Sequence, residues 1–132
     1  KDHLYRSRNY ISLILSILLI ITAIVNYEKW YTLITFSLTG SFLIYLSLIE
    51  KAQWLGKFFR SYLVVLIPFF VVNGVLTGSA IENQVVWYND SENLGIRLLT
   101  IPVEDSIYGM LLILMNTFFY EKFKILFLPS DR

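Results

Sequence analysis

The chain alternates between long apolar segments and polar connections. Four predominantly apolar segments span residues 10–27, 30–49, 59–80 and 104–122, and their charged residues lie at the ends. Crossing the hydrocarbon core of a bilayer, about 30 Å thick, takes roughly 17–25 helical residues. Since lipid offers no hydrogen-bond partners to an open backbone, such segments fold as helices. The pattern predicts an all-α integral membrane protein with four transmembrane helices in a single domain over residues 1–132.

The connections between these segments differ in length. Residues 26–29 form a tight turn and residues 50–58 a short loop, whereas residues 81–103 form a long polar loop before the last helix. Loops of this length inside compact domains are usually functional or disordered. This loop carries apolar residues throughout, which favours an ordered loop.

Basic residues gather at alternate connections. Nine of the eleven Lys and Arg residues lie in the N-terminal segment, the second connection and the C-terminal tail: Lys1, Arg6, Arg8, Lys51, Lys57, Arg60, Lys122, Lys124 and Arg132. The other side has only Lys29 and Arg97. Because Lys and Arg are enriched in cytoplasmic loops, we expect both termini to be cytoplasmic and the long loop to lie outside. The predicted location is the cell membrane, with several passes.

Composition removes several classes of function. Hydrophobic residues make up 56% of the chain and charged residues 16%, against about 45–50% and about 25% in soluble domains. The absence of cysteine and the single histidine, His3, argue against disulfide scaffolds, thiolate nucleophiles and Cys- or His-based metal sites. A net charge of +1 gives no electrostatic footprint for nucleic acid. With no nucleotide-binding motif and no acidic cluster, we expect neither cofactor nor metal.

The densest chemical signal is Pro102-Val103-Glu104-Asp105 at the mouth of the fourth segment. One interpretation is a simple helix start, because Pro suits the first helical position and acidic residues complement the helix dipole. The other is a catalytic carboxyl pair, because desolvation and a like-charged neighbour favour the protonated form of a carboxyl group. A protonated carboxyl group can act as a general acid. Adjacent helical residues diverge by about 100°, so we expect one carboxyl to face the bundle and the other to cap the helix or face water.

Other polar residues on the apolar segments are open to two interpretations. Tyr108 lies one turn beyond the carboxyl pair, and Asn116 lies about 18 Å along the helix axis from Glu104 at 1.5 Å per residue. Asn73 lies in the third segment. An amide within the membrane either contacts a substrate or hydrogen-bonds to a neighbouring helix.

The long loop contains a second group of candidates. Its residues Trp87, Tyr88, Asn89, Glu92 and Arg97 form either a surface turn or a lid over a pocket that faces the lipid. Arg97 is expected to pair with Glu92, Glu104 or Asp105, and a pairing with one of the latter two would favour the ionised carboxyl.

Several of these stretches together resemble a known family. They are residues 68–78 (PFFVVNGVLTG), 86–89 (VWYN), 92–97 (ENLGIR), 100–105 (TIPVED) and 116–121 (NTFFYE). They resemble the C-terminal half of the heterodimeric-type lycopene cyclase domain, over about residues 66–122. The first two segments match only as hydrophobic helices. Members of that family carry a Pro-x-Glu-Glu/Asp motif in each half, so the resemblance implies that this chain is half of a two-part cyclase and needs an N-terminal half, fused or separate.

The resemblance also implies a reaction. The acyclic end of lycopene, or of a related carotenoid, is protonated at its terminal double bond, the next double bond closes a ring, and a proton is lost. No net redox change occurs, so no cofactor is needed. By resemblance Glu104 and Asp105 are the catalytic acid/base residues. Tyr108, Trp87, Tyr88, Asn73 and Asn116 are candidate substrate-binding residues, and the aromatic faces of the first three could stabilise a cation. Arg97, Glu92 and Asn89 are expected to contact the catalytic and substrate-binding residues and to hold their side chains in position.

Two alternatives compete with a cyclase. One is a small membrane subunit that scaffolds a partner protein and catalyses nothing. The other is a carrier for a lipid, which usually places an ionisable group near the membrane midplane. The apolar segments have no such group.

Overall fold

The fold consists of four long helices and a small hairpin. The computed structural model describes the backbone of residues 2–127 and the side chains of residues 10–124 and 127. In chain order the elements are α1 (Asp2–Val25), α2 (Trp30–Ile44), the π-helix η1 (Tyr45–Ile49), α3 (Leu55–Leu76), β1 (Arg97–Leu98), β2 (Ile101–Pro102) and α4 (Val103–Phe127). The prediction of a mostly helical protein is confirmed over the described residues.

Some predicted boundaries were wrong. The first helix begins at Asp2 instead of residue 10, and the third spans Leu55–Leu76 instead of residues 59–80. Gly78 has a φ of +98°, and the backbone N–H of Ser79 donates to the Gly74 carbonyl at 2.7 Å. A left-handed residue followed by such a bond ends a helix, so Ser79 and Ala80, the predicted end of the third segment, do not continue α3. The hairpin of β1 and β2, which pairs Arg97 with Pro102, was not predicted.

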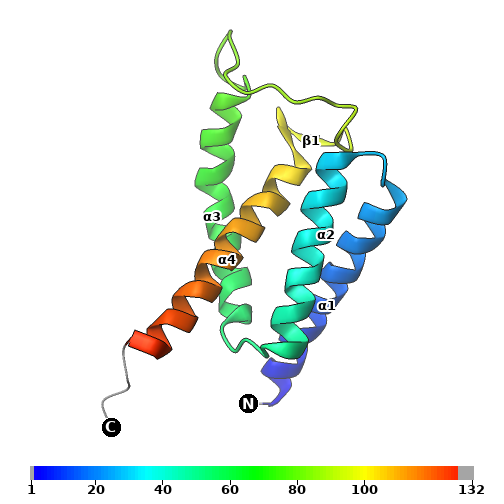
Figure 1. The fold of residues 1–132 in the computed structure, drawn as a ribbon. Coiled ribbons are helices and arrows are strands. Elements are labelled where there is room, and N and C mark those ends of the chain that lie inside the picture. The colour runs from blue at the N-terminus through cyan, green and yellow to red at the C-terminus, as the bar shows by residue number, and fades with distance from the viewer. Residues whose placement is uncertain (1, 128–132) are drawn as a thin grey trace.

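Helix α1 packs on α2, and α4 packs on both α2 and α3. Figure 1 shows α1 and α2 side by side, with α4 running obliquely from the start of α2 across α3. The loop after α3 crosses the upper end of the molecule and reaches the start of α2. At the same end, the hairpin leads directly into α4. The amino ends of α2 and α4 therefore lie together beneath the long loop.

The α1–α2 pair is held closely by small residues. A Cβ atom added at Gly40 would lie 2.8 Å from Ile20 Cγ1 and 3.1 Å from the Ser16 carbonyl oxygen, so only glycine fits there. The Ser47 hydroxyl donates to the Ser12 hydroxyl at 2.7 Å, and both side chains are buried. At the far end of α4, an ion pair of 2.7 Å joins Lys122 to Glu50. These contacts fix the position of α2, and α4 packs against α2.

The surface of the bundle is strongly apolar. Large exposed hydrophobic residues run along α1 and α3, for example Ile14, Ile17, Leu63, Ile67 and Val71. Within the described chain, Trp30–Ile49 and Leu55–Leu76 are long and apolar enough to cross a membrane by length and composition, and Tyr10–Val25 is a shorter apolar helix. Extended apolar surface of this kind fits contact with lipid or with another protein.

Candidate active site

The first turn of α4 buries both acidic residues of the predicted pair. The backbone N–H of Val103 donates to the Ile96 carbonyl at 3.0 Å, which ties the helix start to the hairpin. Glu104 is 0% exposed and Asp105 is 6% exposed. Their side chains do diverge, because they contact different partners. However, the expectation that one of them would only cap the helix or face water was wrong, since α2 and the loop cover both.

One oxygen of the Glu104 carboxyl group is fully engaged and the other is free. Oε1 accepts hydrogen bonds from the Thr32 hydroxyl at 2.6 Å and from the backbone N–H of Leu94 at 2.7 Å. Oε2 is buried and has no hydrogen-bond partner among the described residues. A buried polar atom without a partner is costly and calls for an explanation. This oxygen is therefore the clearest chemical feature of the site.

Asp105 is held by two tyrosines. The Tyr31 hydroxyl donates to Oδ1 at 2.5 Å, and the Tyr88 hydroxyl donates to Oδ2. The two rings stack with their centroids 6.4 Å apart. Burial, together with the hydrogen bond to Asp105, raises the pKa of the Tyr88 phenol, so this phenol stays protonated as a donor. We call Tyr31 and Tyr88 the tyrosine clamp.

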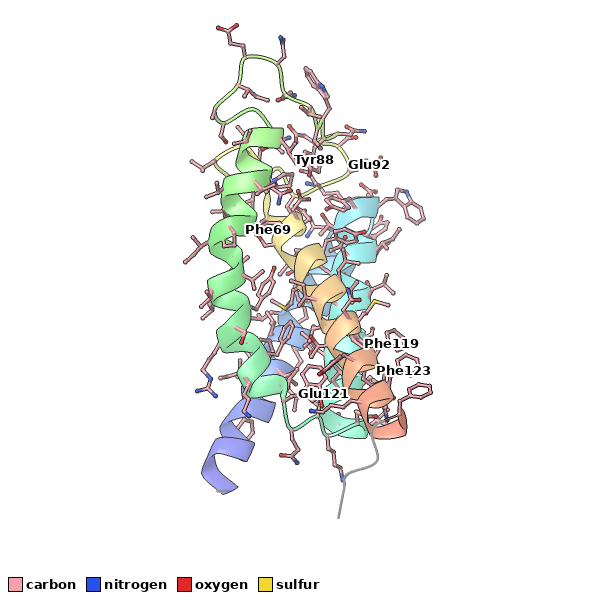
Figure 2. All side chains as sticks on the ribbon, turned by 90° about the vertical axis from the view of Figure 1, so that its left-hand side faces the viewer. Phe69, Tyr88, Glu92, Phe119, Glu121 and Phe123 are labelled. Carbon is pink, nitrogen blue, oxygen red and sulfur yellow. The ribbon has the colours of Figure 1, made fainter. Side chains whose placement is uncertain are left out.

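The long loop is hydrogen-bonded to the start of α2, next to the tyrosine clamp. The Glu92 carboxylate accepts from the backbone N–H of Trp30 at 3.2 Å, and the Glu92 carbonyl accepts from that of Tyr31 at 3.0 Å. Glu92 therefore caps α2 and satisfies N–H groups that a helix start leaves open. Two residues further along, the N–H of Leu94 reaches Glu104. Figure 2 shows Tyr88 and Glu92 at the same end of the molecule, far from Glu121.

The position of Arg97 corrects a prediction. Arg97 pairs with Asp90 and donates to the Thr100 carbonyl at 2.9 Å, and no ion pair among the described residues joins it to Glu92, Glu104 or Asp105. The Arg97 guanidinium, as a hydrogen-bond donor, holds the pKa of Asp90 below its usual range. The guanidinium also lies 5.8 Å from the centroid of the Tyr88 ring. Arg97 therefore supports the clamp from outside and leaves both buried carboxyl groups unpaired by any described cation.

Other predicted residues are not brought to the carboxyl pair. Trp87 is 78% exposed and Tyr108 is 46% exposed. The amides of Asn73 and Asn116 each donate to a carbonyl one turn earlier in their own helix, at 2.9 Å. The Asn89 side chain accepts from Ser91 in a local turn. The roles of these residues in substrate binding remain predictions.

Two residues at the site were missed by sequence reasoning. Tyr31 and Thr32 are 74 and 72 residues away from their partners Asp105 and Glu104. Neither belongs to a motif, and both read as the interfacial start of an apolar helix. Only the adjacency of the amino ends of α2 and α4 reveals them.

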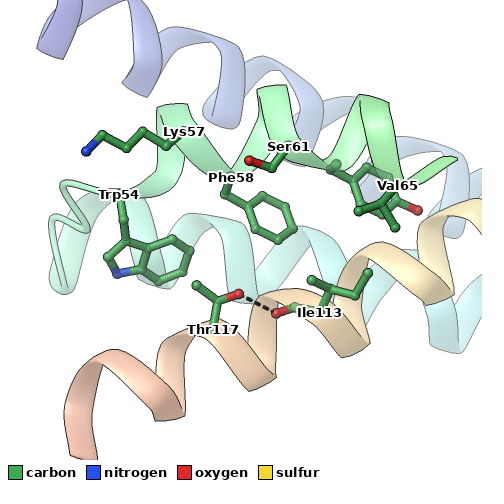
Figure 3. Close-up of a pocket in the computed structure, with 8 residues that line it drawn as sticks. Trp54, Lys57, Phe58, Ser61, Val65, Ile113 and Thr117 are labelled. Carbon is green, nitrogen blue, oxygen red and sulfur yellow. Dashed lines mark hydrogen bonds between the residues drawn. The ribbon is translucent and has the colours of Figure 1, made fainter. Parts of the chain in front are cut away.

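A pocket lies elsewhere on α4. It has a volume of about 230 Å³ and lies between α3 and α4 (Figure 3). Its lining is mainly apolar and aromatic: Trp54, Lys57, Phe58, Ser61, Tyr62, Val65, Ile113 and Thr117. Ile113 follows Glu104 by nine residues, which corresponds to half a turn around the helix and about 13 Å along it. The pocket therefore opens on the face of α4 opposite Glu104.

These features define a class of protein. The described chain is a helical bundle with an apolar surface, two helices long enough to cross a membrane, and a buried carboxyl pair beneath an ordered loop. The family model described as lycopene cyclase matches residues 28–123, which include both carboxyl groups, the clamp and Thr32. The chain therefore belongs to the lycopene cyclase family, and the resemblance noted in the sequence is confirmed. No curated protein and no solved structure matches the chain.

Proposed function

We propose that this chain carries the acid/base centre of a membrane-embedded lycopene cyclase that closes the acyclic end of a carotenoid without a cofactor. The reaction is an isomerisation of the intramolecular lyase type, with Glu104 as the acid and Asp105 as the base. The observation that carries the proposal is the free Oε2 of Glu104, buried beside a second carboxyl group that is held differently. Membership of the lycopene cyclase family supplies the substrate class.

The chemistry requires one proton donor and one proton acceptor. The donor adds a proton to the terminal double bond and leaves a tertiary cation. The next double bond attacks this cation and forms the six-membered ring, which moves the positive charge into the ring. Loss of a ring proton to the acceptor restores a neutral product. Atoms and charge balance without an oxidant or a reductant.

Glu104 fits the donor. Its Oε1 already accepts two hydrogen bonds, so a proton on the carboxyl group would sit on Oε2, which has no described partner to compete for it. No ion pair among the described residues engages this carboxyl group, so Oε2 is available to carry a proton and to deliver it. A carboxylic acid in such surroundings is suited to general acid catalysis.

Asp105 fits the acceptor. Each of its oxygens accepts a hydrogen bond from a phenol, so the carboxyl group is held in an acceptor role on both sides. A carboxylate close to the site where a ring cation develops also stabilises that cation electrostatically. The two carboxyl groups thus have different surroundings and different roles.

The rest of the proposal concerns the membrane and a partner. We propose four transmembrane helices with both termini in the cytoplasm and the loop after α3 outside, in the cell membrane. A carotenoid is apolar and would enter from the lipid, so Trp87, Tyr108, Asn73 and Asn116 are proposed to line its path. We further propose that the chain works with an N-terminal half domain, fused or separate.

Pigment analysis in lycopene-accumulating cells tests the proposal. The chain is expressed alone and with a candidate N-terminal half, as wild type and as Glu104→Gln and Asp105→Asn. We expect cyclised carotenoids only when both halves are present. We expect each variant to lose activity by at least about 100-fold, because general acid/base groups contribute 10²–10⁴-fold.

Glu121→Gln is the matched control, because it changes an acidic residue of the same helix at the opposite end of the molecule. It should retain activity. Unchanged lycopene beside a well-expressed partner would exclude the cyclase, and full activity of both carboxyl variants would favour a scaffold. Cyclisation by the chain alone would show that no partner half is needed.

A further inference from the structure

The two buried carboxyl groups differ in how far their orientation is fixed. Asp105 receives one phenol on each oxygen, from α2 and from the loop. Glu104 is bound through one oxygen only. Two donors approaching opposite oxygens prevent rotation of the carboxylate and fix its direction. The fold thus holds Asp105 more firmly than its proposed reaction as a base alone would require.

The clamp is itself supported. The Tyr31 and Tyr88 rings stack on each other, and the Arg97 guanidinium lies 5.8 Å from the centroid of the Tyr88 ring. Glu92 holds the backbone of Tyr31 at the start of α2. Both phenols therefore have partners that fix their rings. Groups held in this way can define a position to within a fraction of an ångström.

A fixed base matters in the last step of the proposed reaction. After ring closure, the cation can lose a proton from three neighbouring carbons. Loss from the carbon that joins the ring to the polyene chain gives the β-ring. Loss from the ring CH₂ group on the other side gives the ε-ring, and loss from the methyl group gives the γ-ring. The reacting cation is the same in each case, so the location of the base decides the product.

We propose that Tyr31 and Tyr88 are positioning residues that fix the Asp105 carboxylate and thereby determine which ring type is formed. This inference rests on the proposed cyclase function. In the step concerned, the carbon–hydrogen bond breaks, its electron pair forms the ring double bond, and the proton goes to Asp105. Return of that proton to Glu104, which donated one at the start, completes the cycle.

The experiment compares ring types as well as total conversion. Tyr31→Phe and Tyr88→Phe are expressed with the partner half in lycopene-accumulating cells, and the β, ε and γ end groups are separated and quantified. We expect the share of the minor ring types to rise about tenfold in each variant, the smallest effect expected from losing one hydrogen bond to a charged group. Tyr27→Phe is the control, because the hydroxyl of that exposed tyrosine donates to the neighbouring Glu28, away from the carboxyl pair, and it should keep the wild-type ratio.

Thr32→Val separates positioning from general damage. It removes a donor to Glu104 and leaves Asp105 untouched, so it should lower conversion without altering the ratio of ring types. Tyr88→Phe is also expected to fold like the wild type, because the Tyr88 side chain lies in the loop and is only partly buried. Protein levels in the membrane fraction are measured for every variant.

The outcomes distinguish this inference from the proposed function. If the wild type cyclises lycopene and both tyrosine variants keep its ratio of ring types, the clamp does not set the product and the inference is overturned. A ratio that changes equally in Thr32→Val would also overturn it, since general loosening of the site would then be the cause. A wild type that forms no ring with its partner present overturns the cyclase itself and the inference with it.

Discussion

The two faces of α4 differ in what they bury. Toward α2 and the loop, the helix presents Glu104 and Asp105, and four described donors meet their oxygens. Toward α3, it presents Ile113 and Thr117 to a mainly apolar pocket of about 230 Å³. The first face has groups that can move a proton, whereas the second has room for an apolar group.

The contrast shows that volume and chemistry are separated in this chain. Ligand sites are usually concave, apolar and lined with a few polar groups, which would direct attention to the pocket. Yet α4 itself lies between the pocket and Glu104. On the α3 side, the Tyr62 hydroxyl donates to the Ser106 carbonyl, next to the carboxyl pair in the chain. We therefore expect catalysis to depend on the face toward α2 and to be insensitive to the pocket.

Among variants that keep both carboxyl groups, the largest expected effect comes from moving the Glu104 carboxyl group. Glu104→Asp shortens the side chain by one methylene group and withdraws it from Thr32 and Leu94. A misplacement of about 1 Å can cost a factor of about 100 in rate, so we expect a loss of about that size in cyclised carotenoid per unit of protein.

Glu121→Asp provides the control, because it shortens an acidic residue on the same helix. Activity retained in Glu104→Asp would show that the exact position of this carboxyl group is unimportant. The proposed difference between the two faces of α4, of which only the face toward α2 requires precisely placed groups, would then be wrong.

The sequence predicts the helices and the carboxyl pair better than it predicts how the helices pack against one another. The length and apolar content of the segments located four helices, and Pro102-Val103-Glu104-Asp105 located the carboxyl pair at a helix start. The end of α3 was misplaced because the backbone is left-handed at Gly78, before the predicted end at residue 80, and hydrophobicity does not report backbone conformation. Local backbone conformation of this kind shifts the end of a helix without changing the number of helices.

The partners of the carboxyl groups could not be predicted because they depend on tertiary packing. Tyr31 and Thr32 look like the ordinary start of an apolar helix, and only the packing of α2 on α4 brings them to Asp105 and Glu104. Arg97 was expected to pair with Glu92, Glu104 or Asp105 but pairs with Asp90, an exposed residue of the same loop. The position of a carboxyl pair at a helix start was therefore predictable from a motif, whereas the hydrogen-bond partners of the pair were not.

A smaller effect is expected from a single donor on the same face. Thr32→Val preserves the branched shape of the side chain but removes the hydroxyl that binds Glu104 Oε1. Loss of a buried hydrogen bond costs about 1–3 kcal/mol, so conversion should fall about tenfold. Conversion is measured by pigment analysis after normalisation to protein level.

Thr22→Val is the control for Thr32→Val, because the Thr22 hydroxyl donates to the Leu18 carbonyl within its own helix. It removes a hydroxyl group distant from the carboxyl pair. Equal losses in the two variants would mean that any threonine hydroxyl matters, and the face toward α2 would lose its special status.

Filling the pocket should leave catalysis almost unchanged. Val65→Phe adds a ring to the lining between α3 and α4, on the face of α4 opposite Glu104. We expect conversion within about twofold of the wild type, since neither carboxyl group nor its donors are touched, which a time course of pigment formation can establish. Val64→Phe, which adds the same ring to an exposed neighbour outside the pocket, is the control.

A large loss in Val65→Phe but not in Val64→Phe would place the pocket on the path of the substrate. The two faces of α4 would then act together, and the separation argued above would be wrong.

The smallest effect concerns the exposed ion pair above the site. The Arg97 guanidinium lowers the pKa of Asp90, so the pair stabilises the fold above the unfolded-state pKa of Asp, about 3.9, and this contribution is lost as the pH falls through the lower folded value. Asp90→Asn should therefore be slightly less stable than the wild type near neutral pH, and the difference should vanish in acid or at high salt. Thermal unfolding in detergent at several pH values measures this difference in stability, with Glu82→Gln in the same loop as the control.

Conversion of lycopene should be unchanged in Asp90→Asn, because Asp90 contacts neither carboxyl group. A loss of cyclisation in Asp90→Asn would instead mean that the outer support of Tyr88 by Arg97 reaches the catalytic face, and the boundary of that face would have to include the loop surface.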